Sequence, residues 1–185
     1  MNNAKLLQGL LALSAAQEWA SARAEWSLVD VAESGEGARC LCGHHPVHDL
    51  CRMRNSATGS EALVGNCCAK RFMGMQSDAI FSGIKRIAAN NSKSLGDEAL
   101  ALAARNGWIT GWEEALYRKA SKKKGVTDSQ AAKKAEINER ILARVRTPVL
   151  GRVEFTPAAI PTLPPGAPKD SDWVPALGIK GPYDD

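Results

Sequence analysis

Three cysteines and three histidines occur within twelve residues of this 185-residue chain, in the stretch CLCGHHPVHDLC at positions 40–51. They are all of the histidines and three of the five cysteines, and the other two, Cys67 and Cys68, follow in VGNCCAKRF. Thiolates and imidazoles are the usual ligands of Zn²⁺, and a structural site surrounds the ion with four of them. The cluster therefore predicts a zinc site.

We expect the four zinc ligands to be Cys40, Cys42, Cys51 and Cys68. The turn CLCG can direct two thiolates toward one ion, because Gly43 lets the backbone fold back. Cys51 would lie on the strand that follows, and Cys68 in the first turn of a helix, whose partial positive charge favours a thiolate. A knuckle, a β-hairpin and a helix in this order are typical of a treble-clef-like zinc site.

Two alternatives to this ligand set remain open. Cys67 and Cys68 are neighbours whose side chains diverge, so only one of them should bind the metal. A histidine could also replace Cys51, and the chain offers His44, His45 and His48.

Catalysis is not expected of this protein. A catalytic zinc ion keeps an open coordination position beside a base. Asp49 and Glu61 are the candidate bases, but four cysteines would close the shell. The sequence also has no Gly-rich phosphate-binding loop, no carboxylate cluster and no convincing pair of nucleophile and base.

The expected location of the protein is the cytoplasm. The amino-terminal stretch MNNAKLLQGLLALS has Lys5 as its charged side chain and a short apolar run that breaks at Ser14, unlike a secretory signal. No segment holds the roughly 18 apolar residues that span a bilayer, so a membrane is not expected among the partners. In a reducing compartment, clustered cysteines are more often metal ligands than disulfides.

The hydrophobic pattern predicts an α+β fold. Leucines at helical spacing predict a helix over 3–25, and alternating apolar residues predict a strand over 26–33. Two further strands are expected at 48–54 and 61–64, joined by the turn residues NSATGS. Asn66 is expected to cap the helix that carries Cys68.

Three regions of different character follow from this pattern. Residues 1–76 are expected to form the zinc-binding α+β domain with its amino-terminal helix. Residues 77–146 have a helical pattern that is interrupted at 94–97, 106–107 and 124–128. Residues 147–185 are rich in proline and acidic on balance, so we expect a disordered tail.

The helical region is more basic than the whole chain. The protein carries a formal net charge of +4, whereas positions 113–146 hold ten Lys or Arg against five acids. Such a surface could bind phosphates, and the alternative is an ordinary solvated helix face. The residues expected to contact nucleic acid are Arg118, Lys119, Lys122, Lys123 and Lys124, with Lys70 and Arg71 beside the zinc site.

Aromatic residues adjoin this basic region. Trp108, Trp112 and Tyr117 could stack on bases, as rings do in proteins that bind single strands. However, Trp108, Trp112 and Leu116 recur every four residues, which is the spacing of a core stripe. We therefore expect Trp112 to lie in the core.

The zinc-binding segment resembles one found in uncharacterised proteins of bacteriophages and bacteria. That motif has C-x-C-G, a cysteine or apolar residue before x-I-x-N, and V-G-x-x-C-x-x-x-F. The matching positions are Cys40, Cys42, Gly43, Cys51, Asn55, Val64, Gly65, Cys68 and Phe72. The resemblance implies that Cys68, which directly precedes AKRF, is the ligand rather than Cys67.

A second stretch, GWITGWEEALYRKASKKKGVTDSQAAKKAEINERIL, is similar to a helical module of phage proteins that handle nucleic acid. The module reads W-E-x-x-F followed by L-S-x-K-Q. Here Tyr117 takes the place of the aromatic residue and VTDSQ that of L-S-x-K-Q, without its lysine. The two resemblances imply a zinc-containing accessory protein of phage or mobile-element origin.

From these features we expect a non-catalytic, zinc-containing accessory protein that binds DNA or RNA. The alternative is a protein-interaction module that modulates or inhibits a host protein. Salt separates the two, because counterion release makes binding to phosphates fall steeply with salt concentration.

Overall fold

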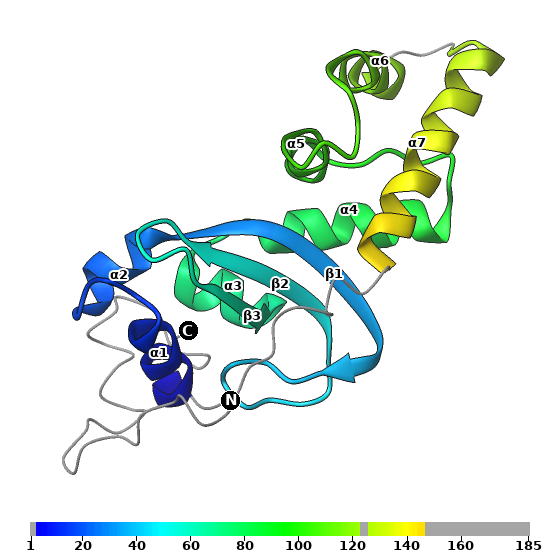
Figure 1. Ribbon diagram of the computed structural model, residues 1–185. Coiled ribbons are helices and arrows are strands. Elements are labelled where there is room, and N and C mark those ends of the chain that lie inside the picture. Colours follow the sequence, from blue (N-terminus) through cyan, green and yellow to red (C-terminus); the bar gives the residue numbers. More distant parts are fainter. Residues whose placement is uncertain (1–2, 123–125, 147–185) are drawn as a thin grey trace, which may run out of the picture. The chain divides into compact units, whose positions relative to one another are not determined.

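The computed structural model describes residues 3–122 and 126–146 (Figure 1). They form two compact units, residues 3–75 and residues 76–146. The first unit combines helices with a three-stranded antiparallel sheet, and the second is helical. The predicted α+β class is therefore confirmed. The predicted tail, residues 147–185, lies outside the described residues.

The sheet of the first unit has the order β1-β2-β3 and is antiparallel throughout. Its strands are β1 (Trp26–Ala38), β2 (Val47–Asn55) and β3 (Glu61–Gly65). Strand β1 runs through the predicted turn SGEG, with an irregular register between Glu33 and Ala38. In the centre of the sheet, Cys51 lies opposite both Val31 and Val64.

The two faces of the sheet differ, because successive side chains of a strand point to opposite sides. Val31, Cys51 and Val64 share one face and are at most 2% exposed. The other face carries a charged group, in which Arg52 contacts Asp30 at 3.1 Å and Glu61 at 3.5 Å. Burial raises the pKa of the Asp30 carboxyl, against the attraction of Arg52.

The single helix predicted over 3–25 is wrong. Two helices occupy this region, α1 (Asn3–Ala12) and α2 (Trp19–Glu25). Tertiary hydrogen bonds stabilise the break. The Trp26 indole N–H donates to the Ser14 hydroxyl at 2.9 Å, and the Glu25 carboxylate accepts the backbone N–H groups of Ala15 and Ala16.

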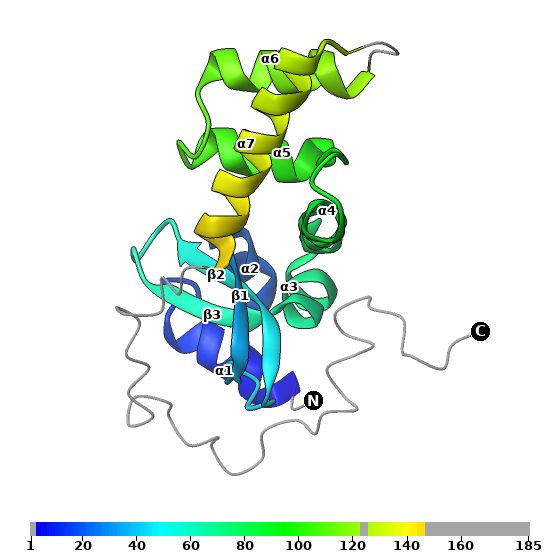
Figure 2. The same ribbon diagram turned by 90° about the vertical axis from the view of Figure 1, so that its right-hand side faces the viewer.

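Helix α3 (Asn66–Met73) follows β3 without a loop and packs against β2 and β3 (Figure 2). The prediction that Asn66 caps this helix is wrong. The cap position belongs to Gly65, whose backbone is extended, and no side chain caps the helix. Helix α3 ends at Gly74 in the left-handed conformation that glycine favours.

The second unit consists of four helices, and Figure 2 shows α7 crossing in front of α5 and α6. Their bounds are α4 (Ser77–Ala89), α5 (Asp97–Arg105), α6 (Gly111–Lys122) and α7 (Asp128–Arg146). A buried polar link ties α6 to α7. The Tyr117 hydroxyl donates to the Asn138 side-chain oxygen at 2.6 Å and accepts the Leu95 N–H at 2.8 Å.

A capping box fixes the start of α6. The Thr110 N–H donates to the Glu113 carboxylate at 2.9 Å, and the Glu113 N–H donates to the Thr110 hydroxyl at 3.2 Å. Glu113 is buried and also accepts a 2.6 Å hydrogen bond from Arg140 of α7. The bonds from Arg140 and Thr110 lower the pKa of Glu113 to about 2. This carboxylate therefore sets which side of α6 faces the core.

Candidate metal centre

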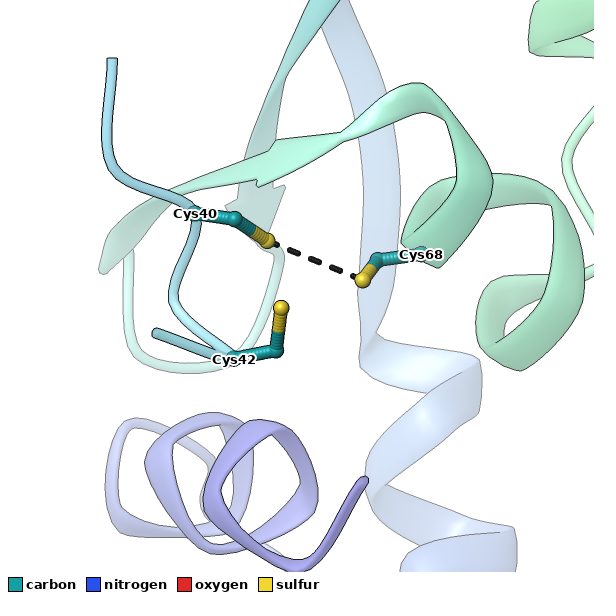
Figure 3. A group of neighbouring side chains, drawn as sticks. All are labelled: Cys40, Cys42 and Cys68. Carbon is teal, nitrogen blue, oxygen red and sulfur yellow. Dashed lines mark hydrogen bonds between the residues drawn. The ribbon is translucent and has the colours of Figure 1, made fainter. Parts of the chain in front are cut away.

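The knuckle, residues 40–44, lies in the connection between β1 and β2. The Gly43 N–H donates to the Cys40 carbonyl at 2.8 Å, and the Cys40 N–H donates to the His44 carbonyl at 3.0 Å. Gly43 has φ +87°, a left-handed conformation that costs glycine little. This turn brings the thiols of Cys40 and Cys42 to the same side (Figure 3).

The knuckle is held between the edge of the sheet and helix α1. The Leu41 N–H donates to the Leu63 carbonyl of the edge strand β3 at 3.2 Å. The Gly65 N–H donates to the Cys40 sulfur at 3.1 Å. On the other side, Leu41 packs against Gly9 of α1, where an added Cβ would lie only 3.0 Å from the Leu41 side chain. Both sides of the knuckle are thus fixed by the fold.

Helix α3 supplies the third thiol. Because the helix starts directly after β3, its first turn places Cys68 opposite the knuckle (Figure 3). The sulfurs of Cys40 and Cys68 are 3.6 Å apart, and all three sulfurs lie within 4.8 Å of one another. Bonds of about 2.3 Å to a tetrahedral zinc ion would separate two sulfurs by about 3.8 Å. The group therefore fits a metal ion.

Electrostatics favour deprotonation at one of the three thiols. Hydrogen bonds from Cys40 and then Cys68 lower the pKa of Cys42. The contacts of Cys68 with Cys40 and Cys42, together with burial, raise the pKa of Cys68. All three side chains are 2% exposed, so three thiolates without a cation would be costly. A divalent metal ion removes that cost by binding the sulfurs.

Cys51, the predicted fourth ligand, is not among the three sulfurs that the structure brings together. Its sulfur is not within 4.8 Å of all three others. Cys51 lies on the central strand β2, whereas the knuckle bonds to β3, so one strand intervenes. Neighbouring strands are about 4.8 Å apart. Cys51 is fully buried between Val31 and Val64 instead.

The alternative ligands differ in their positions. Cys67 is exposed, while its neighbour Cys68 is buried in the group. His48 Nδ1 lies 2.7 Å from the Ser34 carbonyl. His44 and His45 are exposed in the turn after Cys42.

The candidate base Glu61 is remote from the thiols. It lies at the start of β3, four residues before Gly65, which corresponds to about 13 Å along a strand. Its carboxylate contacts Arg52 at 3.5 Å. The structure therefore separates Glu61 along β3 from Gly65, the residue that donates to the Cys40 sulfur.

The predicted nucleic-acid contacts are placed very differently from one another. Arg118 is paired with Glu114 at 2.8 Å and also with Asp97. Lys119 and Lys70 are exposed, and Arg71 is half-buried. Lys123 and Lys124 lie outside the described residues, as does the side chain of Lys122. Arg118 is therefore a poor phosphate ligand.

The prediction that Trp112 lies in the core is wrong. Trp112 is 65% exposed. Among the described residues, it stands out as a large hydrophobic side chain that faces solvent. The buried face of α6 carries Glu113, Tyr117 and Ala120, so Trp112 faces away from the core. The sequence contained a signal for this orientation of α6, because Thr110 and Glu113 have the spacing of a capping box.

Comparisons of the chain with protein-family models, curated proteins and solved structures give no match. In residues 3–122 and 126–146, no helix has the length and apolar character required to cross a bilayer.

Proposed function

We propose that this protein is a zinc-stabilised, non-catalytic accessory protein that binds nucleic acid. Cys40, Cys42 and Cys68 would hold the ion, and the exposed face of α6 would hold the nucleic acid. This proposal also includes a treble-clef-like zinc site, a phage or mobile-element origin and a cytoplasmic location.

The donor set supports zinc as the metal. Three buried thiols from two segments, the knuckle and α3, converge on one point. Thiolates select soft or borderline ions such as Zn²⁺ over Mg²⁺ or Ca²⁺. When bound, the ion would join the β3 edge, the knuckle and α3, and its binding energy would contribute to folding.

The exposed Trp112 is the observation that supports nucleic-acid binding best. Trp112, Ala115 and Lys119 are all exposed and follow the spacing i, i+3 and i+7 of one helix face. Trp112 and Lys119 are two turns apart, about 10.5 Å. An indole can stack on a base while a lysine binds a phosphate, and such stacking is worth about 1–3 kcal/mol per base.

The ion pairs of the second unit leave few cations for phosphate contacts, which favours modest affinity. Arg118, Lys133 and Arg140 contact carboxylates within the unit, so these cations are largely neutralised. Lys119 and the following Lys122–Lys124 sequence remain as candidates for phosphate contacts. Four contacts on a single strand would give a slope of log affinity against log salt of about −3.

Binding to labelled single-stranded DNA, measured by anisotropy across a salt series, tests this proposal. Trp112→Ala should weaken binding about tenfold, because one stacking contact is lost. Lys119→Gln should weaken binding and flatten the salt slope by about 0.7. Lys93→Gln is the matched charge control, since the loop that contains it contacts the buried side of α6 through Leu95.

The competing function is a protein-interaction module. It rests on the same Trp112, because tryptophan is enriched in the hot spots of protein interfaces. If the wild type shows no salt-dependent binding to single- or double-stranded DNA or to RNA at about 50 mM salt, the nucleic-acid proposal fails. Equal effects of Lys119→Gln and Lys93→Gln would also count against the α6 face.

A further inference from the structure

We propose that His44 is the fourth ligand, so that the metal centre is a Cys₃His site made of Cys40, Cys42, His44 and Cys68. This inference rests on the zinc binding proposed above. It assigns to His44 the fourth coordination position, which the sequence pattern gives to Cys51 and which the three clustered cysteines leave open.

The knuckle places the backbone of His44 next to the thiols. The Cys40 N–H donates to the His44 carbonyl at 3.0 Å, so His44 lies directly across the turn from Cys40. His44 also follows Cys42 by two residues within the knuckle. The backbone of His44 is thus next to two ligands.

The exposure of His44 allows its ring to turn toward the sulfurs. The ring nitrogens of His44 do not lie within 4.8 Å of all three sulfurs, but the side chain is exposed, so a change of rotamer toward the sulfurs would not disturb the core. The other candidates are less suited. The Nδ1 of His48 lies 2.7 Å from the Ser34 carbonyl of β1, and β1 is the strand farthest in the sheet from β3, to which the knuckle bonds. Cys67 is exposed beside the buried Cys68. His45 follows His44 directly and is one residue farther along the chain from the two thiols of the knuckle.

Charge also favours a neutral fourth ligand. Three thiolates around Zn²⁺ carry a net charge of −1, and a fourth thiolate would raise this to −2 in a buried site. Two cations lie close to the knuckle. The Lys5 ammonium is 3.5 Å from the position of a Cβ added to Gly43, and Arg39 donates to the Gly43 carbonyl at 3.4 Å. In a buried site, the smaller net charge of a Cys₃His centre costs less desolvation than that of a Cys₄ centre. A histidine, which binds zinc as the neutral imidazole, meets this requirement.

Metal binding by the full chain and by four variants tests the assignment. Zn²⁺ affinity is measured by competition with a chelator, and the Co²⁺-loaded protein is measured by its visible spectrum. His44→Ala should lower Zn²⁺ affinity by about tenfold or more and change the Co²⁺ spectrum. His45→Ala, the matched control, and Cys51→Ser should change neither. His44→Cys should restore tetrahedral binding.

X-ray absorption of the zinc-loaded wild type gives an independent test. We expect three sulfur neighbours at about 2.3 Å and one nitrogen at about 2.0 Å. Four sulfur neighbours, or an unchanged spectrum and affinity in His44→Ala, would overturn the assignment of His44 while leaving zinc binding intact. A wild type that binds neither Zn²⁺ nor Co²⁺ would instead refute the proposed metal centre as a whole, and with it the assignment of His44.

Discussion

At the scale of single residues, the environment of each cysteine determines its chemistry. Cys40 accepts the Gly65 N–H and lies 3.6 Å from the sulfur of Cys68. Cys51 is as deeply buried as these two, but hydrophobic strand residues surround it. Cys67 is exposed. Burial alone therefore does not identify a ligand, whereas convergence of sulfur atoms does.

Replacing the two adjacent cysteines separates these roles. Cys68→Ser should lower the bound zinc to less than about half an equivalent, because a structural site needs its full set of donors. It should also destabilise residues 38–74. Cys67→Ser should change neither property. Elemental analysis and thermal unfolding of both variants provide the check, and the reverse order of effects would move the ligand by one position.

At the scale of the elements, the capping box decides which face of α6 becomes a surface. Glu113 bonds to Thr110 within the helix start and to Arg140 across the unit. Those bonds direct Glu113 inward, and Tyr117 follows on the same face with its link to Asn138. Trp112 then faces outward. The rotational orientation of α6, rather than the hydrophobicity of Trp112, determines that this side chain is exposed.

We expect Glu113→Gln to destabilise the protein at pH 7 by about 2 kcal/mol, because hydrogen bonds to a charged group are lost. Glu113 has a folded pKa of about 2 against an ordinary value of 4.5. Its contribution is therefore complete above pH 4.5 and disappears as the pH falls from 4.5 toward 2. Denaturant unfolding at pH 7 and pH 3 should show a smaller difference between variant and wild type at pH 3.

Glu114→Gln is the control for this experiment. Glu114 is a half-buried partner of Arg118 in an i,i+4 pair, and such pairs contribute about 0.5 kcal/mol or less. If Glu113→Gln and Glu114→Gln destabilise the protein equally, or if the effect of Glu113→Gln is independent of pH, the capping box does not have the role assigned to it.

At the scale of the whole molecule, the two compact units differ in what holds them together. Residues 3–75 surround the thiol group, whereas residues 76–146 have a helical core with the Tyr117–Asn138 link and the Glu113 ion pairs. All three clustered cysteines belong to the first unit. Metal should therefore stabilise the first unit selectively.

Removal of metal with a strong chelator should show this difference. Amide hydrogen exchange should become faster in residues 38–74, because the binding energy of the ion is lost from that unit. Exchange in α4, α5, α6 and α7 should change little. A uniform loss of protection across both units would contradict this expectation, and so would unchanged exchange in a protein shown to lose zinc.

The sequence by itself determined the features that depend on local pattern. Alternating residues predicted the first strand, and the turn residues NSATGS predicted the hairpin of the other two. The C-x-C turn with a later cysteine predicted a thiol site, because spacing limits which side chains can meet. The sequence did not determine the break between α1 and α2, which the Ser14 and Glu25 hydrogen bonds stabilise from distant positions. It also could not show that Cys51 lies apart from the other three sulfurs, because the intervening strand appears only when β3 pairs with β2. For Trp112 the capping box gave a local signal, but Arg140 of another helix holds Glu113 inside. These deciding contacts join residues of different elements, and spacing within one element does not specify them.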